Sequence, residues 1–170
     1  FDRSMPEEVN RVLTDRLATH LFVTEKSGVE NLEREGVPEE QIHLVGNVMI
    51  DSLKACLSAA RERPVLEELG LDEGGYLAVT LHRPSNVDDG HSLRQALRLL
   101  SAAADRWPVV FPAHPRTRKR IEEHGLGNLV EGAAGLTVTE PLGYVDFLRL
   151  MDGAGAVLTD SGGIQEETTA

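Results

Sequence analysis

The sequence predicts an α/β fold with parallel sheets, because short runs of β-branched and apolar residues alternate with longer segments of helical periodicity. Several of the short runs are apolar at every position, which is typical of strands that helices cover on both faces. The chain has 170 residues, of which 41% are hydrophobic, and this is enough for a buried core. We therefore expect a folded protein rather than a disordered one.

Residues 1–47 are expected to hold two helix–strand pairs. A helix over about Pro6–Thr19 starts with a proline, whose fixed φ angle suits a first helical turn, and it leads to a strand at Leu21–Thr24. A second helix over Glu25–Glu35 stops before Gly36, and the strand Ile42–Val45 follows. Such a piece is too small to bury a good core alone. We expect it to be the C-terminal part of a first Rossmann-like domain.

Residues 48–170 are expected to form a second Rossmann-like, nucleotide-binding domain. A helix over Val48–Arg61 opens it, and the charged segment Arg61–Gly75 predicts a surface connection. Strands and helices then alternate, at Tyr76–Leu81, His91–Asp105, Val109–Ala113, Thr117–His124, Leu136–Thr139, Tyr144–Met151 and Ala156–Thr159. The chain starts at Phe1 and ends within a helical pattern without a stop signal, so we expect a fragment of a longer protein, truncated at both ends.

Charge and composition exclude several classes of function. There are 17 Lys and Arg against 28 Asp and Glu, a net charge of −11, which argues against nucleic-acid binding because that needs a basic face. No apolar run approaches the ~20 residues that span a bilayer, so we expect no membrane partner. A single cysteine, Cys56, excludes an internal disulfide framework, and no signal segment opens the chain. We expect a cytoplasmic location.

Two basic motifs directly follow predicted strands, where open parallel sheets bind their ligands. His82 and Arg83 come after the strand at Tyr76–Leu81 and are suited to face an anion, with His82 able to move a proton. The alternative for His82 is a histidine bonded to a backbone carbonyl. His114 and Arg116 come after the strand at Val109–Ala113, in a basic stretch that is suited to attract a nucleotide diphosphate. The alternative is a solvated first helical turn.

The strongest local signal is Asp160-Ser161-Gly162-Gly163, which follows the last predicted strand and runs into a helix. Free backbone N–H groups at a helix N-terminus attract anions, and glycines let phosphate oxygens approach closely. Ser161 is suited to cap the helix. Glu167, farther along the helix, is an acceptor for both hydroxyls of a ribose. The alternative is a capped strand–turn–helix without a ligand.

Two further candidates come from Glu7 and Phe147. Glu7 lies in the first turn of the first predicted helix, where an acid either stabilises the helix dipole or acts in catalysis. Phe147 is either a core residue or a platform for a base, since aromatic residues make up only 4% of the chain.

Six motifs together identify a known family. They are Met5–Arg11 (MPEEVNR), Gly46–Asp51 (GNVMID), Thr80–Asn86 (TLHRPSN), Pro112–Pro115 (PAHP), Pro141–Phe147 (PLGYVDF) and Asp160–Glu167 (DSGGIQEE). With these motifs in this order, the chain resembles the non-hydrolysing UDP-N-acetylglucosamine 2-epimerases over nearly its whole length. The last motif is shared more widely among nucleotide-sugar enzymes.

The resemblance implies two Rossmann-like domains of the glycosyltransferase-B type that face each other across a cleft. It also implies interconversion of UDP-GlcNAc and UDP-ManNAc by loss and re-addition of UDP, with no cofactor and no metal. A homodimer and a role in polysaccharide biosynthesis are expected by the same analogy. The roles carried over are acid/base catalysis by Glu7, support of UDP departure by His82, and UDP binding by His82, Arg83, Phe147, Ser161, Gly162, Gly163 and Glu167.

Two departures from the family pattern bear on these expectations. Pro84 and Ser85 stand where the family has an Arg and a Glu. The family's first strands, with further acids near the sugar, do not occur in this sequence, so we expect no turnover from this piece alone. The alternatives are a UDP-sugar glycosyltransferase of the same fold, a non-catalytic UDP-sugar-binding piece, and a hydrolysing relative that releases UDP.

Overall fold

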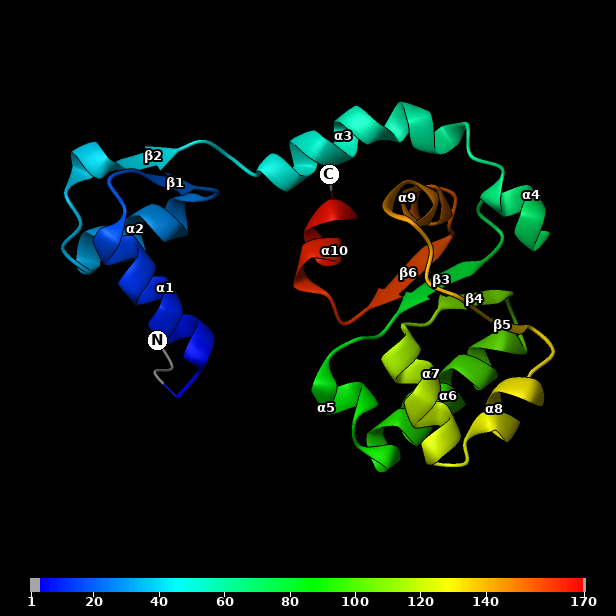
Figure 1. The fold of residues 1–170 in the computed structure, drawn as a ribbon. Coiled ribbons are helices and arrows are strands. Elements are labelled where there is room, and N and C mark those ends of the chain that lie inside the picture. Colours follow the sequence, from blue (N-terminus) through cyan, green and yellow to red (C-terminus); the bar gives the residue numbers. More distant parts are fainter. Residues whose placement is uncertain (1–3, 170) are drawn as a thin grey trace. The chain divides into compact units, whose positions relative to one another are not determined.

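A computed structural model of the chain describes residues 4–169 (Figure 1). These residues form two compact units, with the division between Ser52 and Leu53. Among the described residues, no helix is both long and apolar enough to cross a membrane.

The first unit is a two-stranded parallel sheet with helices. Its elements are α1 (Pro6–Leu17), β1 (Leu21–Val23), α2 (Lys26–Arg34), a 3-10 turn (Glu39–Gln41) and β2 (Ile42–Leu44). Leu21 lies opposite Ile42 in the sheet, and only one face of β1 is buried. Four buried residues, Leu21, Val23, Leu32 and Val37, form its core cluster. This small core agrees with the expectation that residues 1–47 bury little apolar surface alone.

The second unit contains a four-stranded sheet in the order β5-β4-β3-β6, and every neighbouring pair in it is parallel. The strands are β3 (Leu77–Thr80), β4 (Val109–Pro112), β5 (Leu136–Thr139) and β6 (Ala156–Thr159). The helices around it are α3 (Val48–Arg61), which begins before the division between the units, α4 (Val65–Leu69), α5 (Pro84–Val87), α6 (Gly90–Ala104), α7 (Pro115–Glu123), α8 (Gly127–Glu131), α9 (Tyr144–Asp152) and α10 (Gly162–Glu167).

Helices cover both faces of this sheet, as Figure 1 shows. In β4, Val109 and Phe111 pack on the side of α6, whereas Val110 between them packs with Val65 and Leu66 of α4. This alternation follows from the strand geometry, in which successive side chains point to opposite faces. Both sets are apolar because both faces are buried, which explains the continuous apolar runs in the sequence.

The strand order creates a switch point between β3 and β6. From β3 the chain proceeds to β4 and β5 on one side, and it then crosses to β6 on the other side of β3. The loops that leave the carboxyl ends of β3 and β6 therefore both lie at this switch point. Ligands of open α/β sheets bind at such a point.

The structure confirms the predicted α/β fold with parallel sheets and all six predicted strands, each within one residue at either end. Of the two Rossmann-like domains predicted, the described residues contain one, because the first unit has only two strands. The predicted surface connection Arg61–Gly75 is wrong in part. It contains α4, whose Val65 and Leu66 are 3% and 6% exposed and belong to the core. Gly70 ends this helix in the left-handed conformation, with φ of 65°.

Candidate functional site at the switch point

The loops after β3 and β6 meet at the switch point. Thr80 and Thr159 end the two strands as partners in the sheet register, and the amide of Asp160 donates to the carbonyl of Thr80 over 3.4 Å. The motif that starts at His82 and the motif that starts at Asp160 thus lie side by side, although they are 78 residues apart in the sequence.

The carboxylate of Asp160 holds the two loops together. It accepts hydrogen bonds from the main-chain N–H groups of His82 at 3.1 Å and Arg83 at 2.9 Å, and from the side-chain amide of Asn86 at 3.0 Å. Its Oδ1 also lies 2.9 Å from Nδ1 of the His82 ring. In return, Nε of Arg83 donates to the main-chain carbonyl of Asp160 over 2.7 Å. The Asp160 side chain is 9% exposed, so water competes little for these bonds.

The environment of Asp160 favours its charged form. Burial alone raises the pKa of this carboxyl group. The hydrogen bonds from Asn86, Arg83 and His82, together with the charge of His82, lower the pKa by more than burial raises it. The pKa of Asp160 consequently lies below its ordinary value, and the group is a carboxylate at neutral pH.

The turn after Asp160 has the features expected of an anion site. Ser161 is the N-cap of α10, as predicted, and its Oγ accepts from the amide of Ile164 at 3.4 Å. Gly162 and Gly163 are the first two residues of the helix, and no acceptor within residues 4–169 is recorded for their amides. A Cβ atom placed on Gly162 would meet nothing within 4 Å, so the space beside this Cα is open.

Glu167 ends α10 and is half-buried. Burial raises the pKa of its carboxyl group. It lines a hollow of about 510 Å³ together with residues of α3, α9 and β6, among them Leu53, Arg61 and Met151. The pKa of Tyr144 is raised by burial and by the negative charge of Glu167, which places the two side chains within electrostatic reach of each other.

Phe147 packs against two core clusters from α9 and keeps part of its surface exposed. This contact matches the core alternative for Phe147, and it leaves the stacking role as a prediction.

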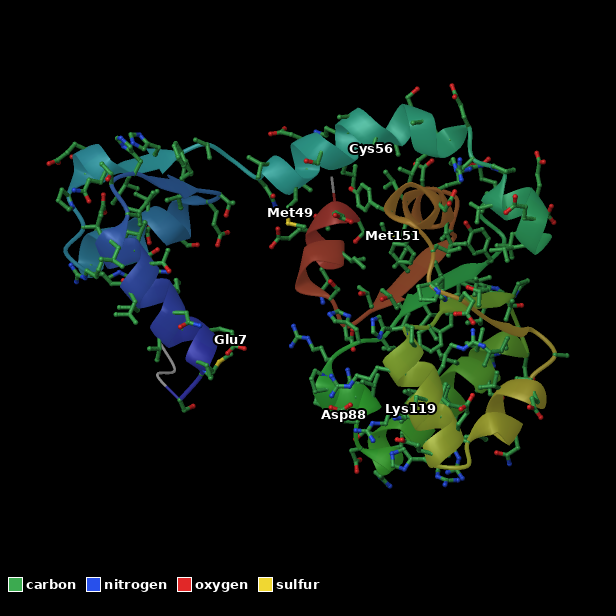
Figure 2. All side chains as sticks on the ribbon, in the orientation of Figure 1. Glu7, Met49, Cys56, Asp88, Lys119 and Met151 are labelled. Atoms are coloured by element: carbon green, nitrogen blue, oxygen red, sulfur yellow. The ribbon has the colours of Figure 1, made fainter. Side chains whose placement is uncertain are left out.

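His114 and Arg116 are engaged elsewhere. His114 is the N-cap of α7, where its Nδ1 accepts from the amide of Arg116 at 3.2 Å. The guanidinium of Arg116 pairs with Asp88, which follows α5 (Figure 2). Arg118 pairs with Glu140 in the same region. Acids thus offset part of the charge of this basic stretch. The part of His114 and Arg116 in diphosphate binding stays a prediction.

Glu7 belongs to the first unit, in the first turn of α1 (Figure 2). Its exposed side chain lines a hollow of about 1040 Å³. The neighbouring Arg11 bonds to Glu8 at 2.8 Å, Asp15 at 2.7 Å and Glu35 at 2.8 Å. Glu7 is not among these partners, and its role in acid/base chemistry stays a prediction.

Sequence reasoning missed the importance of Asp160 and Asn86. Asp160 was part of the glycine motif, but its binding to the His82 loop depends on the pairing of β3 with β6. An aspartate placed directly after a buried strand was the available signal, since a buried carboxylate requires partners. Within residues 4–169, no group of three His, Cys, Asp or Glu side chains is arranged to hold a metal ion.

Comparison with known proteins places the chain in a family. The family model described as UDP-N-acetylglucosamine 2-epimerase matches residues 1–170. The UDP-N-acetylglucosamine 2-epimerase of Methanococcus maripaludis is 38% identical over 98% of this chain and 47% of its own length. The UDP-2,3-diacetamido-2,3-dideoxy-D-glucuronate 2-epimerase of Pseudomonas aeruginosa is 39% identical over 98% of this chain and 45% of its own length.

A solved structure agrees with these matches. The Methanocaldococcus jannaschii UDP-GlcNAc 2-epimerase in complex with UDP-GlcNAc and UDP superimposes with a TM-score of 0.82 and is 36% identical, covering 98% of this chain and 47% of that one. The chain therefore spans about half the length of the relatives it matches. Because the family model matches this chain from residue 1 to residue 170, the chain belongs to the UDP-N-acetylglucosamine 2-epimerase family.

Proposed function

We propose that the whole protein interconverts UDP-GlcNAc and UDP-ManNAc without hydrolysing them. A base removes the proton at C2 while the C1–O bond to UDP breaks, and the C2–H electron pair forms the C1=C2 double bond of a glycal-type intermediate. UDP then adds back to C1, and a proton returns to the opposite face of C2.

The observation that carries this proposal is the joining of the His82 loop to the Ser161–Gly163 turn by Asp160. Loss of UDP develops negative charge on a phosphate oxygen, and donors fixed in advance stabilise such charge best. The amides of Gly162 and Gly163, the hydroxyl of Ser161 and the charged ring of His82 are donors of this kind at one edge of the sheet.

The nucleoside is assigned to Glu167, which follows this turn, and to Phe147 of α9. Glu167 would accept hydrogen bonds from the two ribose hydroxyls, and the exposed part of Phe147 would contact uracil. Glu167 is half-buried and its pKa is raised by burial, which supports a binding role. Carboxylates that are partly removed from water often lie in functional sites.

Glu7 is proposed as one of the carboxylates that move the C2 proton. Its exposed position in a hollow agrees with access to a ligand. A proton transfer of this kind needs more than one acid/base group, since the proton leaves one face of the sugar and returns to the other.

The experiment is to incubate the full-length protein with UDP-GlcNAc in deuterated water, with no acceptor present, and to follow the products by NMR. We expect UDP-ManNAc with deuterium at C2. No conversion without an added acceptor would contradict the proposal and favour a glycosyltransferase, and release of free ManNAc would favour a hydrolysing enzyme. The 170-residue chain alone is expected to bind UDP without turnover.

A second candidate substrate comes from the Pseudomonas aeruginosa relative, whose name specifies a UDP-2,3-diacetamido-2,3-dideoxy-D-glucuronate. The reaction at C2 is the same, and the sugars differ at C3 and C6. The same NMR assay with both UDP-sugars, at equal concentrations, distinguishes them by the ratio of kcat/KM.

A further inference from the structure

We propose that Asp160 is a positioning residue, which fixes His82 with the proton on Nδ1 and turns its Nε2 toward the anion bound at the Ser161–Gly163 turn. This inference rests on the proposed function for the identity of the anion. The part that concerns the ring of His82 stands on the geometry alone.

The contact with Asp160 determines which ring nitrogen of His82 carries the proton. An ionised carboxylate has no proton to donate, so the approach of Nδ1 to within 2.9 Å of Oδ1 of Asp160 is favourable only when Nδ1 carries a proton. In a neutral His82 this leaves the lone pair on Nε2. In a charged His82 it leaves a second N–H on Nε2, and this charged form is the one that can donate to an anion. Neutral histidine in water favours the opposite tautomer, with the proton on Nε2, and Asp160 therefore reverses the ordinary preference.

The two nitrogens of the His82 ring have different surroundings. Nδ1 is held by a side chain that is 9% exposed, whereas the His82 side chain is 55% exposed. Within residues 4–169, no hydrogen bond to Nε2 is recorded. With Nδ1 committed to the protein, Nε2 is the nitrogen left for a ligand.

Asp160 also holds the loop that carries His82. The same carboxylate accepts from the main-chain amides of His82 and Arg83 and from the side chain of Asn86. Asp160 is also the residue directly before the N-cap of α10. The backbone of the anion turn and the ring of His82 are thus fixed by neighbouring atoms of one residue, which keeps both sets of donors in register.

The direct test is the nitrogen chemical shifts of the His82 ring in the labelled 170-residue chain without ligand, at a pH where the ring is neutral. We expect a protonated Nδ1 and an unprotonated Nε2. A ring with its proton on Nε2 overturns the proposal. This test needs no variant and no UDP, so its outcome is independent of the proposed function.

Variants separate positioning from general stability. Asp160→Asn removes the negative charge beside Nδ1 of His82 and puts an NH₂ group where the carboxylate accepted hydrogen bonds. We expect the His82 ring to return toward the Nε2–H tautomer. Asp89→Asn is the matched control, because Asp89 also accepts from a main-chain amide, that of Ser92 at 2.8 Å, but caps α6 instead. Asn86→Ala removes one donor to Asp160 without touching the ring. Both controls are expected to keep the wild-type tautomer, and a similar change in all three variants would contradict the proposal.

The affinity of the same chain for UDP shows whether the position of the His82 ring affects ligand binding. Asp160→Asn and His82→Ala are each expected to weaken UDP binding about tenfold or more, since each removes a charge-assisted contact. If Asp160 acts through His82, the double variant binds about as weakly as His82→Ala alone. If the double variant instead loses affinity by the product of the two single losses, the positioning role is overturned. If the wild-type chain shows the expected tautomer and no affinity for UDP, the proposed function fails and the assignment of the ring remains.

Discussion

The partial burial of Glu167 destabilises the folded state. Burial raises the pKa of its carboxyl group, so the folded state disfavours the charged form that is present at neutral pH. For an acid with a raised pKa, the unfavourable contribution is present above the folded pKa and disappears as the pH falls below it. Binding residues often keep such a position because the ligand, rather than water, satisfies the charge.

We predict that Glu167→Gln stabilises the chain by less than about 1 kcal/mol at pH 7 and weakens UDP binding about tenfold or more. The glutamine removes the buried charge and one strong acceptor for the ribose hydroxyls. Urea denaturation and calorimetric titration with UDP measure the two effects. Glu122 of α7, which is exposed, provides the control Glu122→Gln with changes within about 0.5 kcal/mol. Equal UDP affinity in wild type and Glu167→Gln would refute the assignment to ribose.

The contribution of Asp160 to stability depends on pH in the opposite direction. Its pKa lies below the ordinary value of 3.8, so its contribution to stability is fully present above that value and is lost as the pH falls through the folded pKa. We predict that Asp160→Asn is less stable than wild type from pH 5 to 7, and that the difference shrinks below about pH 4. Urea unfolding of both proteins at each pH tests this. A difference that stays constant down to pH 3 would mean that the charge of Asp160 is irrelevant.

At the scale of elements, the close approach of α6 to the loop before β5 depends on a glycine. A Cβ atom on Gly135 would lie 2.3 Å from the carbonyl oxygen of Ala104, the last residue of α6, and backbone atoms cannot yield easily. We predict that Gly135→Ala lowers the free energy of unfolding by about 1–3 kcal/mol, as overpacking does in cores. Gly127→Ala is the control.

A Cβ on Gly127 meets only a side-chain oxygen, that of Glu131 at 3.9 Å, and the residue lies in α8. Alanine at this position should be neutral or stabilising, because it restricts the unfolded chain. Chemical denaturation compares the two variants. An equal loss in both would show that the contact between Gly135 and Ala104 does not limit the packing.

The elements differ in how far the sequence predicts them. The strands at β3 and β4 are predictable because burial on both faces makes each run continuously apolar. The short helices α4, α5 and α8 have four or five residues, too few for a helical period to emerge in the sequence. Their positions depend on tertiary contacts such as the burial of Val65 and Leu66.

The candidate site shows the same limit. His82, Ser161 and the two glycines were predictable, because each follows an apolar run and parallel sheets bind ligands at their carboxyl ends. The contacts of Asp160 with His82 and Asn86 were not, because they require β6 to pair with β3 rather than with β5. The pairing of Arg116 with Asp88 is equally a product of the fold.

At the scale of the whole molecule, the two units contribute different parts of the proposed chemistry. The second unit holds the residues assigned to UDP, and the first unit holds Glu7. The chain spans about half the length of its relatives. We therefore expect binding to persist in this chain while turnover requires the full-length protein.

We propose above that the turn at Ser161–Gly163 and the loop at His82 bind the diphosphate of UDP. The most direct measurement is the NMR spectrum of the isotope-labelled chain during titration with UDP, with uridine as the control. The amides of Gly162 and Gly163 and the ring of His82 should shift with UDP in a saturable manner, and they should shift little with uridine, which has no phosphate. If these signals stay unchanged while the chain is saturated with UDP, or if uridine moves them equally, the site lies elsewhere.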